Sequence, residues 1–113
     1  MLWSSQQTEF TDKVLEALPQ LRKYFSIVLN QSHSSPSIDG STMVKCLKNL
    51  GSDLAKTIII DNHVENYSQN LTNGIFLPTF YLNSEDHWLK LLSEYLLEFE
   101  SVQDVREKIR RDF

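Results

Sequence analysis

Hydrophobic and polar residues alternate along the chain in a way that predicts short strands separated by helices. Leu2-Trp3 give way at once to Ser4-Ser5, which indicates the end of a strand that enters a loop. Residues 8–18 carry apolar side chains at helical spacing and stop near Pro19, which predicts a helix. This stripe consists of Phe10, Val14, Leu15 and Leu18. A short β-branched apolar run at residues 26–29 predicts the next strand.

The middle of the chain predicts a loop, a short helix and a buried strand. Residues 30–41 are rich in serine and also contain Asn, Pro, Asp and Gly, a composition typical of a loop. Residues 42–50 predict a short helix that ends at Gly51 and carries Lys45. Residues 57–61 form a continuous β-branched run, which is typical of a parallel-sheet strand buried on both faces.

The last third of the chain predicts an edge strand and two helices. A short apolar run at residues 74–78 ends at Pro78, which favours an edge strand. We expect a helix that begins at Ser84 and buries one apolar stripe. That stripe consists of Trp88, Leu89, Leu92, Tyr95, Leu96 and Phe99. Ser101 and Asp104 resemble a capping box that opens a final helix. The apolar stripe of this helix consists of Val102, Val105, Ile109 and Phe113.

The order of these elements predicts an α/β fold, a parallel sheet flanked by helices in a single domain over residues 1–113. Composition agrees with this prediction, because 41% of the residues are hydrophobic. The chain has 15 acidic and 11 basic side chains, a net charge of -4. Its bases are scattered, which argues against direct nucleic-acid binding through a concentrated basic face.

Two further features limit where the protein works. The longest apolar runs are far shorter than the ~18 residues that a membrane span needs. Cys46 is the only cysteine, so no internal disulfide can form. We therefore expect a reducing, intracellular compartment, the nucleus or the cytoplasm rather than the mitochondrion.

Candidate chemistry lies after two of the predicted strands. Ligands of α/β sheets bind at the carboxyl ends of strands, where Ser4 and the pair Asp61-Asn62 stand. Carboxylate and amide oxygens suit a hard cation such as Mg²⁺. The alternative is that Asp61-Asn62 only turn the chain, and that Lys45 lies on a solvated helix face. The histidines and Cys46 show no zinc-site spacing.

Five short motifs follow one another in an order that resembles one known family. They are Leu2-Trp3-Ser4-Ser5, Met43-Val44-Lys45-Cys46-Leu47, Leu50-Gly51-Ser52-Asp53-Leu54, Thr57 to Asn62, and Asn73-Gly74-Ile75. This order resembles the C-terminal part of the CTD-phosphatase-like domain of the haloacid dehalogenase superfamily. The small CTD phosphatases, Dullard, the NLI-interacting-factor proteins and the mitochondrial translocase subunit Tim50 are similar. The resemblance runs from Leu2 to Phe113 and includes Asp104-Val105-Arg106.

The resemblance implies a role for four residues and a substrate class. Ser4 would hold the phosphoryl group, Lys45 would neutralise it, and Asp61 with Asn62 would help to hold Mg²⁺. The implied reaction transfers phosphate from a protein phosphoserine to an aspartate and then hydrolyses the aspartyl-phosphate. The implied partner is a phosphoserine-containing protein such as the C-terminal tail of RNA polymerase II.

The nucleophile motif of that family, Asp-x-Asp-x-Thr/Val, is absent from the 113 residues. The seven aspartates include no pair two residues apart: Asp12, Asp39, Asp53, Asp61, Asp86, Asp104 and Asp112. We therefore expect an N-terminally truncated, partial Rossmann-like domain that lacks the nucleophile strand and is inactive alone. The alternative is a catalytically dead module that binds a phosphopeptide or, like Tim50, a presequence. A third option is a structural subunit whose exposed strand edges pair with another chain.

Overall fold

The strands form three separate pairs, two of them parallel and one antiparallel, in a computed structural model that describes residues 1–113. In chain order they are β1 (Leu2–Trp3), β2 (Val28–Leu29), β3 (Ser35–Pro36), β4 (Met43–Val44), β5 (Ile59–Asp61) and β6 (Gly74–Phe76). The α-helices are α1 (Thr8–Ala17), α2 (Pro19–Arg22), α3 (Trp88–Leu97) and α4 (Val105–Asp112). The 3₁₀-helices are η1 (Gln31–His33), η2 (Leu47–Leu50), η3 (Leu54–Lys56) and η4 (Val64–Asn73). The α/β class is confirmed, and the short parallel pairs are compatible with a partial Rossmann-like fold.

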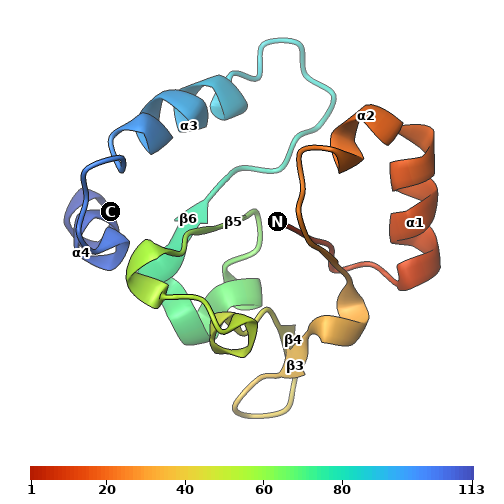
Figure 1. Cartoon of the computed structure of the whole chain (residues 1–113), viewed down its shortest axis with the longest axis horizontal. Helices are drawn as coiled ribbons and strands as arrows, with labels where there is room; N and C mark the ends of the chain where they lie inside the picture. Colours follow the sequence, from red (N-terminus) through yellow and green to blue (C-terminus); the bar gives the residue numbers. More distant parts are fainter. The chain divides into compact units, whose positions relative to one another are not determined.

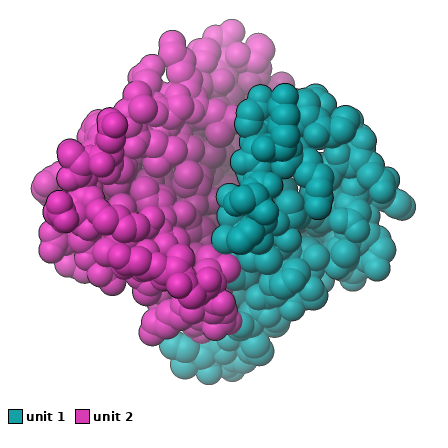
Figure 2. All heavy atoms as spheres, viewed as in Figure 1, with its two compact units in different colours: residues 1–45 teal, residues 46–113 magenta.

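The chain divides into two compact units, residues 1–45 and residues 46–113, which Figure 2 distinguishes by colour. The first unit holds β1 to β4 with the helices between them, and the second holds β5, β6, α3 and α4. None of the helices combines the length and the apolar character that a membrane span requires. The expectation of a single domain over residues 1–113 stays a prediction.

The first unit begins with a parallel β-α-β arrangement. β1 pairs with β2 in the register Leu2–Val28 and Trp3–Leu29, and α1 and α2 connect the two strands (Figure 1). The predicted helix over residues 8–18 is confirmed as α1. It ends at Leu18, whose backbone is not helical, because Pro19 opens a separate turn of helix. The side chain of Leu15 is the buried apolar contact of α1.

The prediction of a helix over residues 42–50 is wrong for the first half of that segment. Met43 and Val44 are extended and pair with Pro36 and Ser35 in the antiparallel hairpin β3–β4. Only the last turn is helical, as η2, and it ends at Gly51 in the left-handed conformation, as expected. The hairpin uses the backbone hydrogen-bonding groups that a helix would have needed, because cross-strand pairing outweighs weak local propensity.

The second unit is built on the parallel pair β5–β6, which Figure 1 shows side by side. η4 connects these strands and contains two non-helical residues, Tyr67 and Asn70. The buried apolar side chains of this unit are Cys46, Leu47, Ile59, Tyr67, Ile75, Val105 and Ile109. Strand β5 begins at Ile59 rather than Thr57, since Thr57 ends η3 and its hydroxyl donates to the carbonyl of Asp53 at the start of that helix (2.7 Å).

Gly74 allows η4 to pack closely on the strand pair. A Cβ atom at this position would fall on the ring of Tyr67, which is itself buried. Glycine is therefore required here by a close approach rather than by an unusual backbone angle.

The prediction that β5 is buried on both faces is wrong. Ile59 and Asp61 are buried, but Ile60 between them is 38% exposed. Successive strand residues point to opposite faces, so Ile60 lies on the face opposite to Ile59 and Asp61, and that face is exposed.

Both C-terminal helices begin later than the sequence suggests. The turn before α3 is held by Asn83, whose side chain accepts a hydrogen bond from the Glu85 amide, and by Asp86, which accepts one from the Trp88 amide. Ser84 is therefore not the cap, and α3 starts at Trp88. The expected burial of its apolar stripe is also wrong, because no residue of α3 is fully buried.

Helix α4 follows the predicted apolar pattern more closely. Val105 and Ile109 are buried, whereas Phe113 is exposed. The Asp104 side chain caps this helix by accepting a hydrogen bond from the Arg106 amide (2.9 Å), so the cap is Asp104 rather than Ser101.

Candidate functional site

Asp61 is the last residue of β5 and lies at the carboxyl end of the parallel pair. Its side chain points to the same face as Ile59, and the residue is 8% exposed. The Asp61 carbonyl accepts a hydrogen bond from the Leu77 amide at 3.1 Å, which extends the pairing with the end of β6. The strand pair thus fixes the backbone from which this carboxylate projects.

The carboxylate of Asp61 is oriented by amide donors of its own unit. Oδ1 accepts hydrogen bonds from the His63 backbone amide at 2.8 Å and from Asn66 Nδ2 at 3.0 Å. Oδ2 accepts a hydrogen bond from the same Asn66 nitrogen at 3.0 Å. The expectation that Asp61-Asn62 turn the chain is confirmed by the His63 bond, which closes an Asx-type turn.

Asn62 connects this turn to a distant segment. Its Nδ2 donates to the Thr79 hydroxyl at 2.9 Å, so its side-chain oxygen lies at the other end of the amide group. The residue is half-buried. Asp61 and Asn62 therefore supply two oxygen-bearing side chains from consecutive positions at the end of β5.

The local electrostatic field at this turn is negative. Burial raises the pKa of the Tyr67 hydroxyl, and the charges of Asp61 and Glu65 raise it further. A further negative charge, on a phenolate close to these two carboxylates, is disfavoured.

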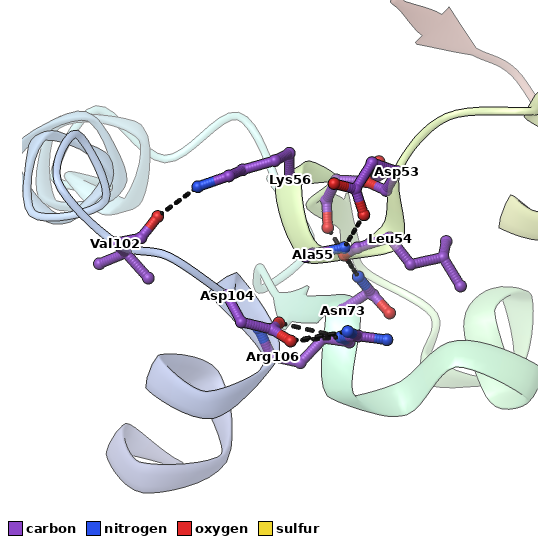
Figure 3. Close-up of polar contacts among 9 residues, drawn as sticks. Asp53, Leu54, Ala55, Lys56, Asn73, Val102, Asp104 and Arg106 are labelled. Carbon is purple, nitrogen blue, oxygen red and sulfur yellow. Dashed lines mark hydrogen bonds and ion pairs between the residues drawn. The ribbon is translucent and has the colours of Figure 1, made fainter.

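A set of hydrogen bonds fixes the backbone that leads into β5 (Figure 3). Asn73 is almost completely buried, and its Nδ2 donates to the carbonyls of Leu54 (2.7 Å) and Thr57 (2.8 Å). The ammonium of Lys56 donates to the Val102 carbonyl at 2.7 Å. The start of β6, the loop before β5 and the segment before α4 are thus linked, which limits how far the end of β5 can move.

The Asp104-Val105-Arg106 motif forms a salt bridge of its own at the start of α4 (Figure 3). The guanidinium of Arg106 binds the Asp104 carboxylate in two places, Nε to Oδ1 at 2.9 Å and Nη2 to Oδ2 at 2.6 Å. This pairing lowers the pKa of Asp104 to about 2. The motif therefore stabilises the first turn of α4 and is not part of the turn at Asp61.

The residues at the end of β5 fit Mg²⁺ as a partial ligand set. Mg²⁺ takes roughly six oxygen ligands, keeps several waters, and is commonly held by one or two carboxylates together with phosphate oxygens of the substrate. Asp61 and Asn62 offer two side-chain oxygens, and no group of three His, Cys, Asp or Glu side chains is placed to hold a metal ion. The remaining ligands of such an ion would be water and substrate oxygens.

Ser4 lies in the first unit, directly after β1. Its amide donates to the Leu29 carbonyl at 2.9 Å and so extends the β1–β2 pairing by one residue. Its hydroxyl oxygen accepts a hydrogen bond from the Gln6 amide at 3.0 Å. The hydroxyl thus lies at the carboxyl end of a parallel strand, at the beginning of the turn that leads into α1.

Lys45 lies in the link between β4 and η2 rather than on a helix. The residue is 8% exposed, so the expectation of a solvated lysine on a helix face is wrong. Lys108, at 6% exposed, is the other buried basic residue of the chain.

The predicted site residues are divided between the two units. Asp61 and Asn62 are neighbours in the second unit, and Ser4 and Lys45 belong to the first. Sequence reasoning missed Asn66 and Thr79, which bind the side chains of Asp61 and Asn62. The only signal for Asn66 was the polar, turn-rich composition of the segment after β5, and nothing in the sequence singled out Thr79.

The sequence profile of one family, described as NLI interacting factor-like phosphatase, matches residues 1–106. The chain is 34% identical over 76 residues to "CTD small phosphatase-like protein 2" of Dictyostelium discoideum, an alignment that covers 67% of this chain and 13% of that protein. It is 35% identical over 71 residues to "CTD small phosphatase-like protein 3" of Caenorhabditis elegans, which covers 62% of this chain and 25% of that protein. This chain thus spans at most about a quarter of these two relatives, yet the profile covers nearly all of it. The chain belongs to the NLI interacting factor-like phosphatase family.

Proposed function

We propose that this chain forms the phosphoryl-binding and Mg²⁺-binding part of a protein phosphoserine phosphatase domain. The observation that carries the proposal is the buried Asp61 carboxylate at the end of β5, held by amide donors and followed by Asn62, in a chain of this family. A bound Mg²⁺ would supply positive charge to the phosphoryl oxygens. Asp61 and Asn62 would hold it, and the amides of His63 and Asn66 would keep the carboxylate in position.

Ser4 and Lys45 are proposed to bind the phosphoryl group itself. A hydroxyl can donate a hydrogen bond to a phosphoryl oxygen, and Ser4 carries one at the carboxyl end of β1. A lysine ammonium acts as a point charge on phosphate. The burial of Lys45 supports this role over that of an ordinary surface lysine.

The 113 residues are proposed to bind a phosphoserine protein without hydrolysing it. The family reaction needs an aspartate oxygen that attacks phosphorus while the bond to the serine oxygen breaks, and a second acid that protonates the leaving oxygen. No two of the seven aspartates stand two residues apart, so this sequence holds no such pair. Turnover would require these groups from a longer polypeptide or another chain.

The same pattern of aspartates favours a second candidate, a phosphatase-like module that binds phosphopeptides and is catalytically dead in every context. The two candidates differ in what happens when an Asp-x-Asp-x-Thr segment is supplied. A phosphatase part would gain activity, whereas a dead module would only bind.

Two assays on the purified chain test the proposal. Hydrolysis of p-nitrophenyl phosphate is measured with and without Mg²⁺, and binding of a phosphoserine peptide is measured in parallel. The variants are Asp61→Ala and, as a matched control, Asp12→Ala, which removes an exposed acid from α1. Circular dichroism verifies that each protein is folded.

We expect no hydrolysis, together with phosphate-dependent peptide binding that Mg²⁺ strengthens and that Asp61→Ala removes. Hydrolysis that needs both Mg²⁺ and Asp61 would show that some other group attacks phosphorus. A folded chain that neither hydrolyses nor binds would refute the proposal.

A further inference from the structure

Asn73 is followed by Gly74, and no other asparagine of the chain is followed by glycine. This pair lies where η4 ends and β6 begins. The backbone nitrogen after an asparagine can attack the carbon of the side-chain amide. Glycine hinders that attack least, because it has no Cβ atom and its backbone is the most mobile. The sequence therefore contains one asparagine of high chemical reactivity, at the start of β6.

The reaction of this pair is deamidation. The Gly74 nitrogen loses its proton and forms a bond to Cγ of Asn73, while the bond from Cγ to Nδ2 breaks and ammonia leaves. Water then opens the resulting cyclic imide at either of its two carbonyl groups. One product is an aspartate, and the other is an isoaspartate, whose main chain runs through the former side chain. Water is the only co-reactant.

The folded chain restrains both groups that would react. Asn73 is 1% exposed, and its Nδ2 donates to the carbonyls of Leu54 at 2.7 Å and Thr57 at 2.8 Å (Figure 3). The backbone amide of Gly74 donates to the Leu71 carbonyl. The leaving group and the attacking nitrogen are therefore each held by hydrogen bonds, and burial keeps water away from the amide.

The packing around Gly74 adds to this protection. The buried ring of Tyr67 occupies the place that a Cβ atom of residue 74 would take, and Gly74 pairs with Ile59 in the β5–β6 register. The nitrogen can therefore turn toward Cγ of Asn73 only after η4 and β6 separate from these neighbours. Such local unfolding has its own free energy, so the rate of deamidation should follow the population of the open state.

Neither product fits the structure that Asn73 occupies. An aspartate has only acceptor oxygens, so the carbonyls of Leu54 and Thr57 would lose their donor inside the protein. Its negative charge would also be buried against these two carbonyl oxygens, which is costly. An isoaspartate lengthens the main chain at the first residues of β6 and disturbs the register with β5.

We propose that Asn73 is a deamidation site that becomes reactive only when η4 and β6 unfold, and that its reaction makes this unfolding irreversible. The observation that carries the proposal is the single Asn-Gly pair, whose two reacting groups are both held by hydrogen bonds. A chain that has reacted would lose the strand pairing that positions Asp61. The inference concerns the second unit alone and does not depend on the proposed function.

The test measures deamidation in the full chain by mass spectrometry of its proteolytic peptides. The chain is incubated at neutral pH with and without guanidinium chloride at a denaturing concentration. The rate at Asn73 is divided by the rate at Asn83, which is exposed and followed by serine, so that the effect of denaturant on the chemistry cancels. Gly74→Ala, measured in denaturant, tests the role of glycine where packing plays no part. Asn73→Asp introduces the product without the reaction.

We expect this ratio of rates to be more than about tenfold higher in denaturant than in the folded chain, since folding buries Asn73 and leaves Asn83 exposed. Gly74→Ala should lower the ratio in denaturant. Asn73→Asp should fail to fold or raise the equilibrium constant of unfolding by more than about tenfold. The same ratio in both states would refute the gating by unfolding.

The irreversibility has a separate readout. After dilution of the denaturant, the fraction that retains Asn73 should regain the circular dichroism spectrum of the folded chain, and the deamidated fraction should not. A deamidated fraction that refolds, or a variant Asn73→Asp with the stability of the parent chain, would refute the irreversible step.

Discussion

The carboxylates of Asp61 and Asp112 are held in different ways within the second unit. Asp61 accepts its hydrogen bonds there from amide groups of His63 and Asn66. Asp112 accepts from the Lys108 ammonium at 2.7 Å and from the Tyr95 hydroxyl at 2.8 Å. The bonds from His63 and Asn66 close a turn, whereas the bond from Lys108 to Asp112 is an ion pair within α4.

Lys108, the partner of Asp112, also contacts another carboxylate and two aromatic rings. Its ammonium also binds Glu98 at 2.7 Å and lies over the rings of Tyr95 (4.9 Å) and Phe99 (5.3 Å). Hydrogen bonds from Lys108 and Tyr95 lower the pKa of Asp112 to about 2. The comparison shows that the Asp112 carboxylate ties two helices through Lys108 and Tyr95, whereas the amide bonds of Asp61 close the turn after a strand.

The largest expected effect is that of replacing Asp61. Asp61→Ala leaves the His63 amide and Asn66 Nδ2 without their acceptor, which should lower the free energy of unfolding by about 1–3 kcal/mol. Phosphopeptide affinity should fall more than about tenfold, since a good charge interaction is worth at least ~1.4 kcal/mol. Denaturant unfolding and peptide titration measure the two effects. Asp112→Ala should lower stability and leave peptide affinity unaltered. A loss of affinity in that variant would contradict the different roles of Asp61 and Asp112.

The next effect concerns the packing beneath the Asp61 turn. Gly74→Ala places a methyl group on the Tyr67 ring, and overpacking of this kind costs about 1–3 kcal/mol. Chemical denaturation of the variant measures this loss. Adding Tyr67→Leu should recover most of it, because a smaller side chain leaves room for the methyl group. If the double variant is less stable than both single variants, the close approach of these two residues is not the cause.

The smallest effect is a pH dependence confined to the region of Asp112. The pKa of Tyr95 is raised from 10.0 to about 12 by burial and by its hydrogen bond to Asp112. The folded protein therefore holds this proton more tightly than the unfolded chain, so stability present below pH 10 is lost as pH rises toward about 12. Tyr95→Phe should flatten the stability curve in this range. An unchanged curve in the variant would exclude Tyr95 as the titrating group.

The acidic side of the same curve depends on Asp112. Its pKa is lowered from 3.8 to about 2, so its contribution to stability is present above pH 3.8 and is lost as pH falls toward about 2. Thermal unfolding of Asp112→Asn across this range should show a weaker acid dependence than the parent chain. A matched loss of acid dependence in Arg111→Ala is not expected, because the Arg111 contact to Asp112 is longer, at 3.3 Å, and exposed.

The sequence was sufficient to predict an element where the residues of that element alone determine its structure. The stripe from Phe10 to Leu18 and the stop at Pro19 gave α1, and Gly51 ended η2 as expected. The β-branched run placed Asp61 and Asn62 at the end of a parallel strand, which is what made them candidates. Helical spacing, proline geometry and strand propensity act over a few residues, so a sequence carries them directly.

Tertiary contacts decided which side chains are buried and which residues bind the candidate site. Residues 43–44 pair across a hairpin and Lys45 after them is buried, while Ile60 lies on an exposed face of β5. Asn66 and Thr79 became part of the candidate site through hydrogen bonds to Asp61 and Asn62, of which the second spans seventeen residues. The sequence by itself supplied the side chains that we propose to hold a cation and a phosphate. Only the folded chain decided which donors hold them in place, because hydrogen-bond partners are set by distance in space and not by spacing along the chain.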